Sequence, residues 1–357
     1  MTTISPRRQA AEWTPHGRVW IGWPSAADLW ETDLAPAQRE VAAFVRAILF
    51  PDPDDPKGER MHGEAVALLA RGEAALESAE AMRERLPRPE LLRVHEAPIG
   101  DIWLRDTGPI FVSDTSGSPV ASAFTFNGWG GKYELPEDDR IAEIVAAKAG
   151  VRLRRFSDFI GEGGAIEADG EGTVITTRQC LLNRNRNPGM SEKDVEAVLK
   201  AAVGALKVIW LDEGLTGDHT DGHVDNLARF VAPGKVVCMR PYGDDDPNAA
   251  VLAAIRASLA RVSDASGRRL EVVEIPSPGL ALLDDEPVPA SHMNFYIANN
   301  SIVMPTYAAL TDDELAGEEA LSILQSLAVR PFAIGLESSH LLTGGGSFHC
   351  ISQQEPA

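Results

Sequence analysis

Apolar and polar positions follow one repeated order along the chain from about residue 109 onward. Two short apolar strands flank a polar turn, an amphipathic helix follows, and another apolar strand ends the unit. The first unit contains the segments PIFV and VASAFTF, a helix over 138–149 and the strand VRLRRF. The order recurs with turns near positions 115, 169, 233 and 299, a spacing of about 60 residues. The pattern therefore predicts four copies of a ββαβ module over 109–336.

The later copies keep this order with their own turn and cap residues. The second has the hairpin AIEADGEGTVITT with Asp169-Gly170 at its turn, a helix capped by Ser191 and the strand KVIWL. The third is LARFVAPGKVVCMR, NAAVLAAIRASLARV and LEVVEI, and the fourth is MNFYIANNSIVMP, DDELAGEEALSILQSLA and PFAIGL. Each copy buries its apolar face against neighbours, as repeat proteins require.

The two ends of the chain supply the remaining apolar segments. RVWIGW, AQREVAAFVRAIL and AVALLA lie near the start and SFHCISQQ at the end, while 50–64 has the composition of a surface loop. We expect these ends to pair and complete a fifth copy. A cyclic array leaves no free sheet edge, so we predict a single closed α/β domain of propeller type over 1–357. The alternative is an ordinary α/β sandwich with irregular repeats.

Charge narrows the choice of partner. The chain of 357 residues has 33 Lys and Arg against 53 Asp and Glu, a formal charge of −20. Such a surface repels phosphate backbones and attracts cations. We therefore expect a small cationic ligand and no nucleic acid. No segment is typical of a signal peptide or of a membrane span of roughly 20 apolar residues, so we expect a cytoplasmic protein without membrane contact.

Polar residues precede the first hairpin strand of successive modules. They are Asp101 and Asp106 in the first, Glu162 in the second, His219, Asp221, His223 and Asp225 in the third, and Ser291 and His292 in the fourth. Cys350 follows about 58 residues after His292. Because equivalent positions of a cyclic array face one axis, we predict that Cys350 meets Asp106, Glu162, His223 and Asp225 at one end of the ring.

Purely structural roles compete with this prediction. A cysteine is more often packing than nucleophile, and we assign Cys180 and Cys238, which lie in apolar runs, to the core. Cys350 differs because Gly344–Gly346 precede it and permit close backbone approach. Asp106 is also compatible with a simple turn. The scattered cysteines fit neither a disulfide framework nor a CxxC metal site.

Two further motifs are compatible with different chemistry. His219, Asp221, His223 and Asp225 alternate in DHTDGHVDN, so a metal hydrolase is an alternative, although it leaves Cys350 without a role. The Gly130-Gly131-Lys132 stretch lacks P-loop spacing, and we expect a surface loop lining the cleft.

A cysteine, a histidine and three carboxylates suit attack on a guanidinium. Asp106 and Asp225 would accept its N–H groups, and its positive charge would help to stabilise the Cys350 thiolate. Addition of Cys350 to the central carbon, with a proton from His223, would release ammonia and leave a covalent thiouronium. His223, oriented by Glu162, would then activate water.

The chain resembles the agmatine deiminases of the bacterial and plant peptidylarginine deiminase-like group. The likeness covers essentially the whole chain, through AEWTPHGRVWIGWPS, DIWLRDTGP, FNGWGGKY, GEGGAIEADGEGTVITT, CLLNRNRNP, TDGHVDN, NFYIANNSIVMPTY and GGGSFHCISQQEP. The resemblance implies a five-bladed pseudosymmetric α/β propeller, no metal or organic cofactor, and hydrolysis of agmatine to N-carbamoylputrescine and ammonia in putrescine synthesis.

Site roles also follow from the resemblance. It implies Cys350 as nucleophile, His223 as acid and base, Glu162 as its partner, and Asp106 and Asp225 as guanidinium ligands. Trp103 and Gly346 are expected at the substrate, and a homo-oligomer, a dimer or larger, is expected.

Two positions depart from the family pattern. Arg178 stands where an acidic residue is usual, and His292 where Tyr is usual. These departures leave open other guanidino substrates, peptidyl-arginine among them, and whether Arg178, Arg184 or Arg186 lies near the pocket rim. A catalytically silent polyamine-binding module is the remaining alternative.

Overall fold

The computed structural model describes residues 8–113, 118–311 and 313–357. Within these ranges it has five mixed sheets of three or four strands and a separate small hairpin, β14 (Leu282–Leu283) with β15 (Glu286–Pro287). Four of the five sheets follow the predicted ββαβ order. The first and second modules are β5 (Ile110–Ser113), β6 (Pro119–Thr125), α6 (Ile141–Ala149) and β7 (Arg152–Ile160), and then β8 (Glu167–Ala168), β9 (Thr173–Thr177), α8 (Glu192–Val203) and β10 (Lys207–Leu211). The third module is β11 (Ala228–Ala232), β12 (Lys235–Arg240), α9 (Ala249–Leu259) and β13 (Glu271–Pro276). The fourth module is β16 (Tyr296–Ile297), β17 (Ser301–Thr306), α10 (Leu315–Ser326) and β18 (Phe332–Glu337).

Strand pairing is the same in each of these four sheets. The first two strands are antiparallel, and the strand after the helix lies parallel to the second, as in the registers Val120↔Arg152 and Val236↔Val272. A parallel partner requires a crossover connection, and the helix supplies it. The predicted module order is confirmed. The first predicted turn, near 115, lies outside the described residues.

Local sequence signals explain where the helices begin and end. Ser191 caps α8 as predicted: its hydroxyl accepts from the Asp194 N–H, and the Asp194 carboxylate accepts from the Ser191 N–H. Gly204 ends α8 with a left-handed backbone at φ 75°. In the first module the predicted helix over 138–149 starts with a 3-10 turn, η3 (Asp138–Arg140), before α6.

The fifth sheet joins the two ends of the chain, as predicted. β19 (Ser352–Pro356) pairs antiparallel with β2 (His16–Gly22), with Ser352 opposite Ile21. β2 lies parallel to β3 (Ala65–Ala70) through α2 (Leu34–Leu49), and 50–64 contains no helix or strand, as expected for a loop. One more helix and strand, α3 (Glu73–Glu84) and β4 (Leu92–Glu96), extend this sheet beyond the prediction.

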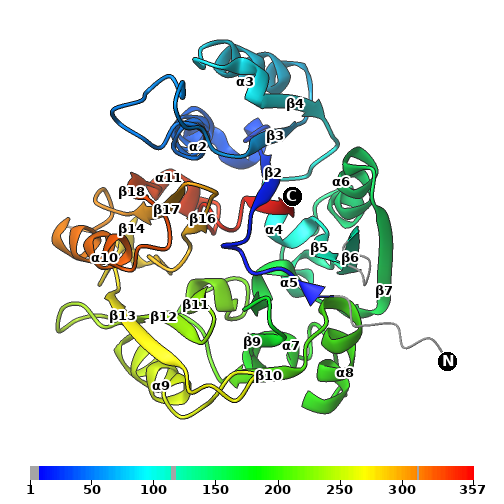
Figure 1. Ribbon diagram of the computed structural model, residues 1–357, viewed down its shortest axis with the longest axis vertical. Helices are drawn as coiled ribbons and strands as arrows, with labels where there is room; N and C mark the ends of the chain where they lie inside the picture. The colour runs from blue at the N-terminus through cyan, green and yellow to red at the C-terminus, as the bar shows by residue number, and fades with distance from the viewer. Residues whose placement is uncertain (1–7, 114–117, 312) are drawn as a thin grey trace.

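The five sheets surround a common centre, and α3, α6, α8, α9 and α10 lie toward the periphery (Figure 1). Strand faces on both sides are buried, as in β12, where Val236 through Met239 have at most 1% exposure, so the strands read as apolar runs. Cys180 and Cys238 are both buried in core clusters, as predicted. Within the described ranges, no helix has the length and apolar character needed to cross a bilayer.

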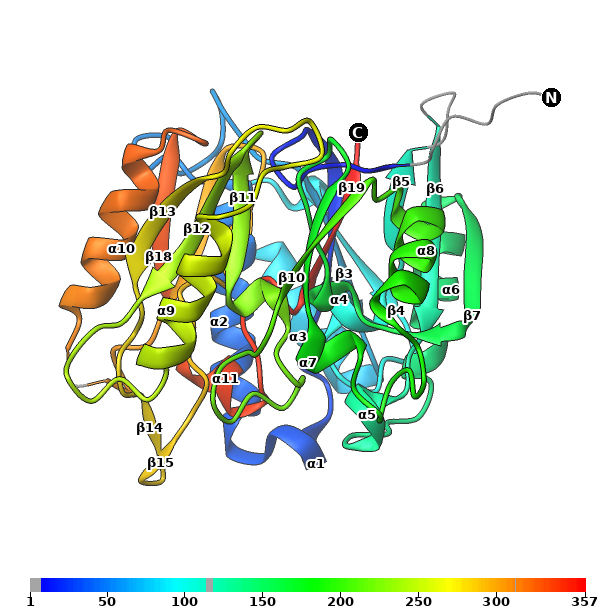
Figure 2. The same ribbon diagram turned by 90° about the horizontal axis from the view of Figure 1, so that it is seen from below.

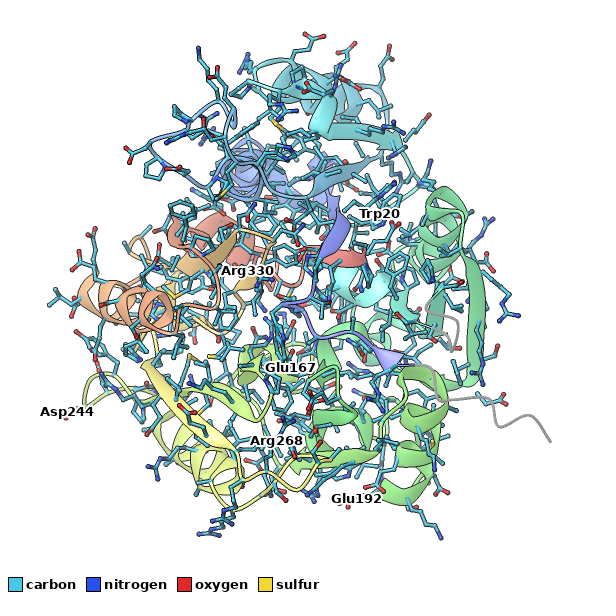
Figure 3. All side chains as sticks on the ribbon, viewed as in Figure 1. Trp20, Glu167, Glu192, Asp244, Arg268 and Arg330 are labelled. Carbon is cyan, nitrogen blue, oxygen red and sulfur yellow. The ribbon has the colours of Figure 1, made fainter. Side chains whose placement is uncertain are left out.

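The two ends of the ring differ. The C-terminus lies at one end, and α1 (Ala27–Trp30), α5 (Gly128–Gly131) and α11 (Ser339–Thr343) lie at the other (Figure 2). Charged side chains such as Glu192 and Asp244 point outward at the rim, whereas Glu167 lies near the centre (Figure 3). The centre therefore holds buried charge.

Candidate active site

The chain enters four of the five sheets through a short turn that carries a residue singled out in the sequence. α4 (Leu104–Thr107) precedes β5 and holds Asp106, and η4 (Gly163–Ala165) precedes β8 with Glu162 as its N-cap. η5 (Val224–Asn226) precedes β11 with His223 as its N-cap, and the turn holding Cys350 precedes β19. Since the sheets surround one centre, these turns meet there.

The structure brings Cys350, Asp106, Glu162, His223 and Asp225 together. The Cys350 Sγ lies 3.7 Å from Asp225 Oδ2. His223 Nδ1 lies 3.7 Å from Asp106 Oδ2, and its Nε2 lies 3.8 Å from Glu162 Oε2. All five side chains are buried, with at most 6% of each residue exposed. Residues remote from one another in sequence thus form one cluster, the arrangement that the module spacing predicts.

Gly164 sits at the centre of this cluster. A Cβ placed there would come within 2.6 Å of His223 Nδ1, 2.8 Å of Asp106 Oδ1 and 3.1 Å of Asp225 Oδ2. No real side chain tolerates such contacts. The second glycine after Glu162 in GEGG therefore allows the three modules to approach one another.

The two aspartates are held by neutral donors or by histidine. The Gly164 N–H donates to Asp106 Oδ1 at 2.9 Å, and the Trp129 indole N–H donates to Oδ2 at 2.9 Å. Asp225 Oδ2 contacts His349 Nδ1 at 2.7 Å. Asp225 Oδ1 and both ring nitrogens of His223 are buried without a hydrogen-bond partner among the described residues. Unpaired buried polar atoms of this kind are typical of a ligand site.

Glu162 is fixed from behind by an arginine. Arg186 donates from Nε to Glu162 Oε1 at 2.7 Å, from Nη1 to Asp221 Oδ2 at 2.8 Å, and from Nη2 to the Thr220 carbonyl at 3.1 Å. Arg186 is 1% exposed. This arginine therefore orients Glu162 and Asp221 and is not available to a ligand.

Asn294 is a site residue that the sequence interpretation missed. Its Nδ2 donates to the Cys350 Sγ at 3.1 Å, and its Oδ1 accepts from the Cys350 and His349 N–H groups at 3.2 and 3.0 Å. The fourth module thus contributes Asn294 and not its neighbours Ser291 and His292. The Ser291 hydroxyl donates to the Asn226 carbonyl, and His292 Nδ1 contacts the Pro276 carbonyl.

Burial and charge set the proton positions. Burial, together with the Asp225 and Asp106 carboxylates, raises the pKa of Cys350 well above its usual range. Burial opposes charge on His223, but Asp106, Cys180 and Glu162 outweigh it and raise the pKa of the imidazole well above its usual range. At neutral pH the site therefore holds a thiol and an imidazolium.

The carboxylates of Glu162 and Asp225 remain ionised. Burial would raise the pKa of Glu162, but His223 and Arg186 lower it below the ordinary value. Burial would likewise raise the pKa of Asp225, and contact with His349 lowers it below the ordinary value. Burial does raise the pKa of Asp106, against the opposing charge of His223.

A cavity of about 330 Å³ has Cys350 in its lining. Its lining residues Trp30, Trp129 and Thr343 belong to α1, α5 and α11, which lie at the end of the ring opposite the C-terminus (Figure 2). Trp30, Trp103, Trp129 and Tyr133 give it aromatic walls, and its acidic lining residues are Glu31, Asp33, Asp101 and Asp106. Asp101 accepts hydrogen bonds from the Trp30 and Trp103 indole N–H groups at 2.9 and 2.8 Å. No Lys or Arg belongs to the described lining residues.

Several sequence candidates lie away from this cavity. Arg178 pairs with Glu192 and Asp212 on the outer surface, and neither Arg178 nor Arg184 belongs to the described lining residues. His292 faces a different cavity of about 300 Å³. These departures from the family pattern therefore do not alter the wall of the cavity above Cys350.

Some residues of the loops around Cys350 line the cavity, and others pack behind its lining. Trp129 and Tyr133, on either side of Gly130-Gly131-Lys132, line the cavity, as expected for that stretch, although Gly128–Gly131 forms a distorted single helical turn. Gly344 and Gly345 line it too. Gly346 packs between Trp103 and Cys350, where a Cβ would come within 2.6 Å of the Trp103 ring. Its contact with a substrate stays a prediction.

The alternating run DHTDGHVDN does not present a single set of metal ligands. His219 Nδ1 contacts the Tyr133 hydroxyl at 3.0 Å, and Asp221 binds Lys132 and Arg186. Within the described parts of the chain, the group of side chains close enough to hold a metal is Glu162, Cys180 and His223.

Comparison with known proteins gives a consistent assignment. A family described as Porphyromonas-type peptidyl-arginine deiminase matches residues 8–356. The agmatine deiminase of Stutzerimonas stutzeri is 38% identical over 100% of this chain and 99% of its own. The solved agmatine deiminase of Enterococcus faecalis superposes with a TM-score of 0.85 at 30% identity, covering 99% and 98% of the two chains. A C. jejuni agmatine deiminase solved with substrate bound has a TM-score of 0.83 at 25% identity, covering 98% and 96%.

Proposed function

The chain belongs to the Porphyromonas-type peptidyl-arginine deiminase family, and from this premise we propose that it hydrolyses agmatine to N-carbamoylputrescine and ammonia. The observation that carries the substrate choice is the cavity lining, which is aromatic and acidic and has no Lys or Arg among its described residues. Agmatine has a guanidinium at one end and an ammonium at the other, so both ends suit this lining. The carboxylate of free arginine would face only like charge.

Asp106 and Asp225 would bind the guanidinium. Each carboxylate accepts N–H groups, and the unpaired Asp225 Oδ1 supplies an acceptor that protein donors leave open. Asp225 lies 3.7 Å from the Cys350 Sγ, so a guanidinium between the two aspartates would place its central carbon near the sulfur. The aromatic walls formed by Trp103 and Trp129 would enclose the methylene chain. Glu31 and Asp33 would then lie on the side of the ammonium.

Substrate charge would also prepare the nucleophile. The same two carboxylates that raise the pKa of Cys350 would be neutralised by the guanidinium, so the thiol loses its proton more easily in the complex. The Asn294 side-chain amide, whose Nδ2 lies 3.1 Å from the sulfur, would stabilise the thiolate that forms. The nucleophile is therefore activated when the correct cation is bound.

His223 would move the protons. The thiolate adds to the guanidinium carbon, the imidazolium of His223 donates a proton to the departing nitrogen, and ammonia leaves a covalent thiouronium. The neutral imidazole then takes a proton from water, whose oxygen adds to the same carbon. Collapse of that adduct breaks the C–S bond, the hydroxyl proton passes to the departing sulfur and regenerates the thiol, and the ureido product is released. Glu162, held by Arg186, keeps His223 oriented and charged.

The coarser features of the chain support several broader proposals. We infer that the five mixed sheets around one centre act as five pseudosymmetric propeller blades and that 1–357 is one domain. We also propose a homo-oligomer, a dimer or larger, acting in the cytoplasm in putrescine biosynthesis without a metal or organic cofactor. Light scattering of the purified chain tests the oligomer, and an unchanged rate after chelator treatment tests the cofactor proposal.

An ammonia-release screen tests the substrate. Agmatine, free arginine and an arginine-containing peptide are offered at equal concentration, with Cys350→Ala as the blank. We expect agmatine to be turned over at least about 100-fold faster in kcat/KM than arginine, since an unpaired carboxylate against an acidic wall costs several kcal/mol. Preference for the peptide would overturn the substrate proposal and leave deimination standing. Agmatine binding without ammonia release would instead indicate a polyamine-binding module.

A further inference from the structure

Cys180 neither forms a bond to the substrate nor transfers a proton in the mechanism above, yet its thiol lies against the acid and base of the site. It sits on α7 (Arg178–Leu181), whose N-cap Thr177 accepts from the Cys180 N–H at 3.2 Å. The Cys180 Sγ lies 4.0 Å from Glu162 Oε2. The ligand atoms of Cys180, Glu162 and His223 all lie within 4.8 Å of one another, and all three residues are fully buried.

Each of the three side chains has coordination capacity left over. Arg186 occupies Glu162 Oε1, so Oε2 faces the thiol and the imidazole. Both ring nitrogens of His223 are buried without a hydrogen-bond partner among the described residues. A fully buried imidazole that has no hydrogen-bond partner among the described residues and lies beside a thiol and a carboxylate is an observation independent of the cysteine itself. Together they make a built cluster of nitrogen, oxygen and sulfur atoms.

The spacing suits a small thiophilic cation. Zinc binds thiolate at roughly 2.3 Å and imidazole or carboxylate at roughly 2.0–2.2 Å, so tetrahedral ligands lie roughly 3.3–3.6 Å apart. The observed separations are 3.8 Å between His223 Nε2 and Glu162 Oε2 and 4.0 Å between Cys180 Sγ and Glu162 Oε2. Contraction by a few tenths of an ångström would bring these two pairs to coordination distance, and the ligand atoms of the third pair, Cys180 and His223, lie within 4.8 Å of each other. A thiolate also selects soft cations over Mg²⁺ and Ca²⁺.

Charge and access are compatible with binding. One thiolate and one carboxylate neutralise a divalent cation, and the protons displaced from the thiol and the imidazole leave to solvent. The cluster lies directly behind the cavity wall. Thr220 lines the cavity, and its hydroxyl accepts from the backbone N–H of His223 at 3.1 Å, while Oδ2 of Asp106, another lining residue, is 3.7 Å from Nδ1 of the ring. A cation attracted by the acidic cavity therefore has a short path to the cluster.

We propose that Glu162, Cys180 and His223 form a binding site for a thiophilic divalent cation such as Zn²⁺ or Cd²⁺, and that the bound cation inhibits the enzyme. Inhibition, unlike binding, rests on the proposed function: a His223 nitrogen held by the cation carries no proton for the departing ammonia or the attacking water. Cys180 is then the residue that makes the active site sensitive to soft metals.

Direct binding is tested without reference to turnover. Cys350→Ala protein, which lacks the thiol that lines the cavity, is titrated with Cd²⁺ while the ultraviolet thiolate-to-cadmium absorption is recorded. We expect one equivalent to saturate the signal, and the signal to disappear in Cys350→Ala/Cys180→Ala but persist in Cys350→Ala/Cys238→Ala. Cys238 is an equally buried thiol in another core cluster and serves as the matched control. A signal that survives loss of Cys180, or is absent from Cys350→Ala, overturns the site.

Inhibition is measured on agmatine turnover with Zn²⁺. We expect the wild-type chain and Cys238→Ala to be inhibited and to recover on adding a chelator, whereas Cys180→Ala needs at least about tenfold more Zn²⁺ for half-inhibition of its own rate. Equal sensitivity of Cys180→Ala and wild type would overturn the inhibitory role. If agmatine is not a substrate at all, the proposed function fails while the cadmium titration still decides the site.

Discussion

Two sets of buried carboxylates meet near the centre of this fold and are neutralised in different ways. In one set, Arg229 binds Glu12 at 2.8 Å and Glu167 at 2.9 Å, and Arg105 lies 3.6 Å from Glu12. In the other, Asp106 and Asp225 have no arginine partner among the described residues. His349 connects the sets, with Nε2 2.9 Å from Glu12 and Nδ1 2.7 Å from Asp225. The first set is closed by the protein, and the second is left for a cation from outside.

The charge of the first set serves the folded structure, whereas the charge of the second set serves ligand binding. A buried carboxylate paired with arginine is satisfied in the folded state, and removing one partner leaves an uncompensated charge. A buried carboxylate without an arginine partner raises the pKa of neighbouring acids and stays costly until a ligand arrives. The raised pKa values of Asp106 and Cys350 are this cost expressed as proton affinity. Substitutions in the two sets should therefore be felt in different measurements.

The largest effect, a loss of turnover, is expected from substitutions in the Asp106 and Asp225 set. Asp106→Asn keeps the shape of the side chain but removes the charge that binds the guanidinium, so we expect agmatine turnover to fall by at least about 10³-fold. Because no buried ion pair with arginine is broken, the unfolding midpoint in denaturant should stay close to that of the wild type. Asp244→Asn, an exposed aspartate on the outer surface and away from the cavity, is the control and should retain most of the rate. Retention of more than about a tenth of turnover by Asp106→Asn would contradict the role given to this carboxylate.

The modules and their convergence could be read from the sequence because each depends on local pattern. Alternating apolar runs, the Ser191 cap and the regular spacing predict the sheets, and the spacing alone brings Cys350 to His223 and Asp106. The pairing of β19 with β2 follows from the need to cover the last sheet edge.

Other parts of the site could not be read in this way. Asn294 lies in the apolar run MNFY, and an amide that contacts sulfur has no spacing that marks it. His349 follows the glycine-rich loop next to the nucleophile, and nothing in its local sequence indicates a role. Its contact with Glu12, 337 positions away, is seen only in the structure. Trp129 contributes through one indole N–H to Asp106, a contact decided by how the loop after β6 folds back. These residues depend on long-range packing, which no local pattern records.

Substitutions in the set formed by Glu12, Glu167 and Arg229 should lower the stability of the fold. Arg229 is fully buried, so Arg229→Met leaves Glu12 and Glu167 without their shared partner, and we expect the free energy of unfolding to fall by about 3–5 kcal/mol. Lys235→Met is the matched control, because its pair with Glu271 is exposed and should be worth less than about 1 kcal/mol. Denaturant unfolding followed by fluorescence measures both. If the two variants lose the same stability, the closed network does not stabilise the fold as described.

The smallest expected effect is on the reactivity of the Cys350 thiol, and it is also the most specific. Asp106→Asn, the variant expected to lose turnover, should make this nucleophile more reactive. Asp106 is one of the two carboxylates that, with burial, raise the pKa of Cys350, so Asp106→Asn should lower that pKa and shift the alkylation profile of the thiol to lower pH. The lower pKa gives more thiolate at neutral pH, and the lower nucleophilicity of a less basic thiolate takes back part of that gain, so we expect a net increase in the alkylation rate. Iodoacetamide labelling across pH measures this, with Cys350→Ala as the blank for Cys180 and Cys238. A profile unmoved or shifted to higher pH would mean that the open carboxylates do not control the sulfur, and the contrast between the two sets would then rest on turnover alone.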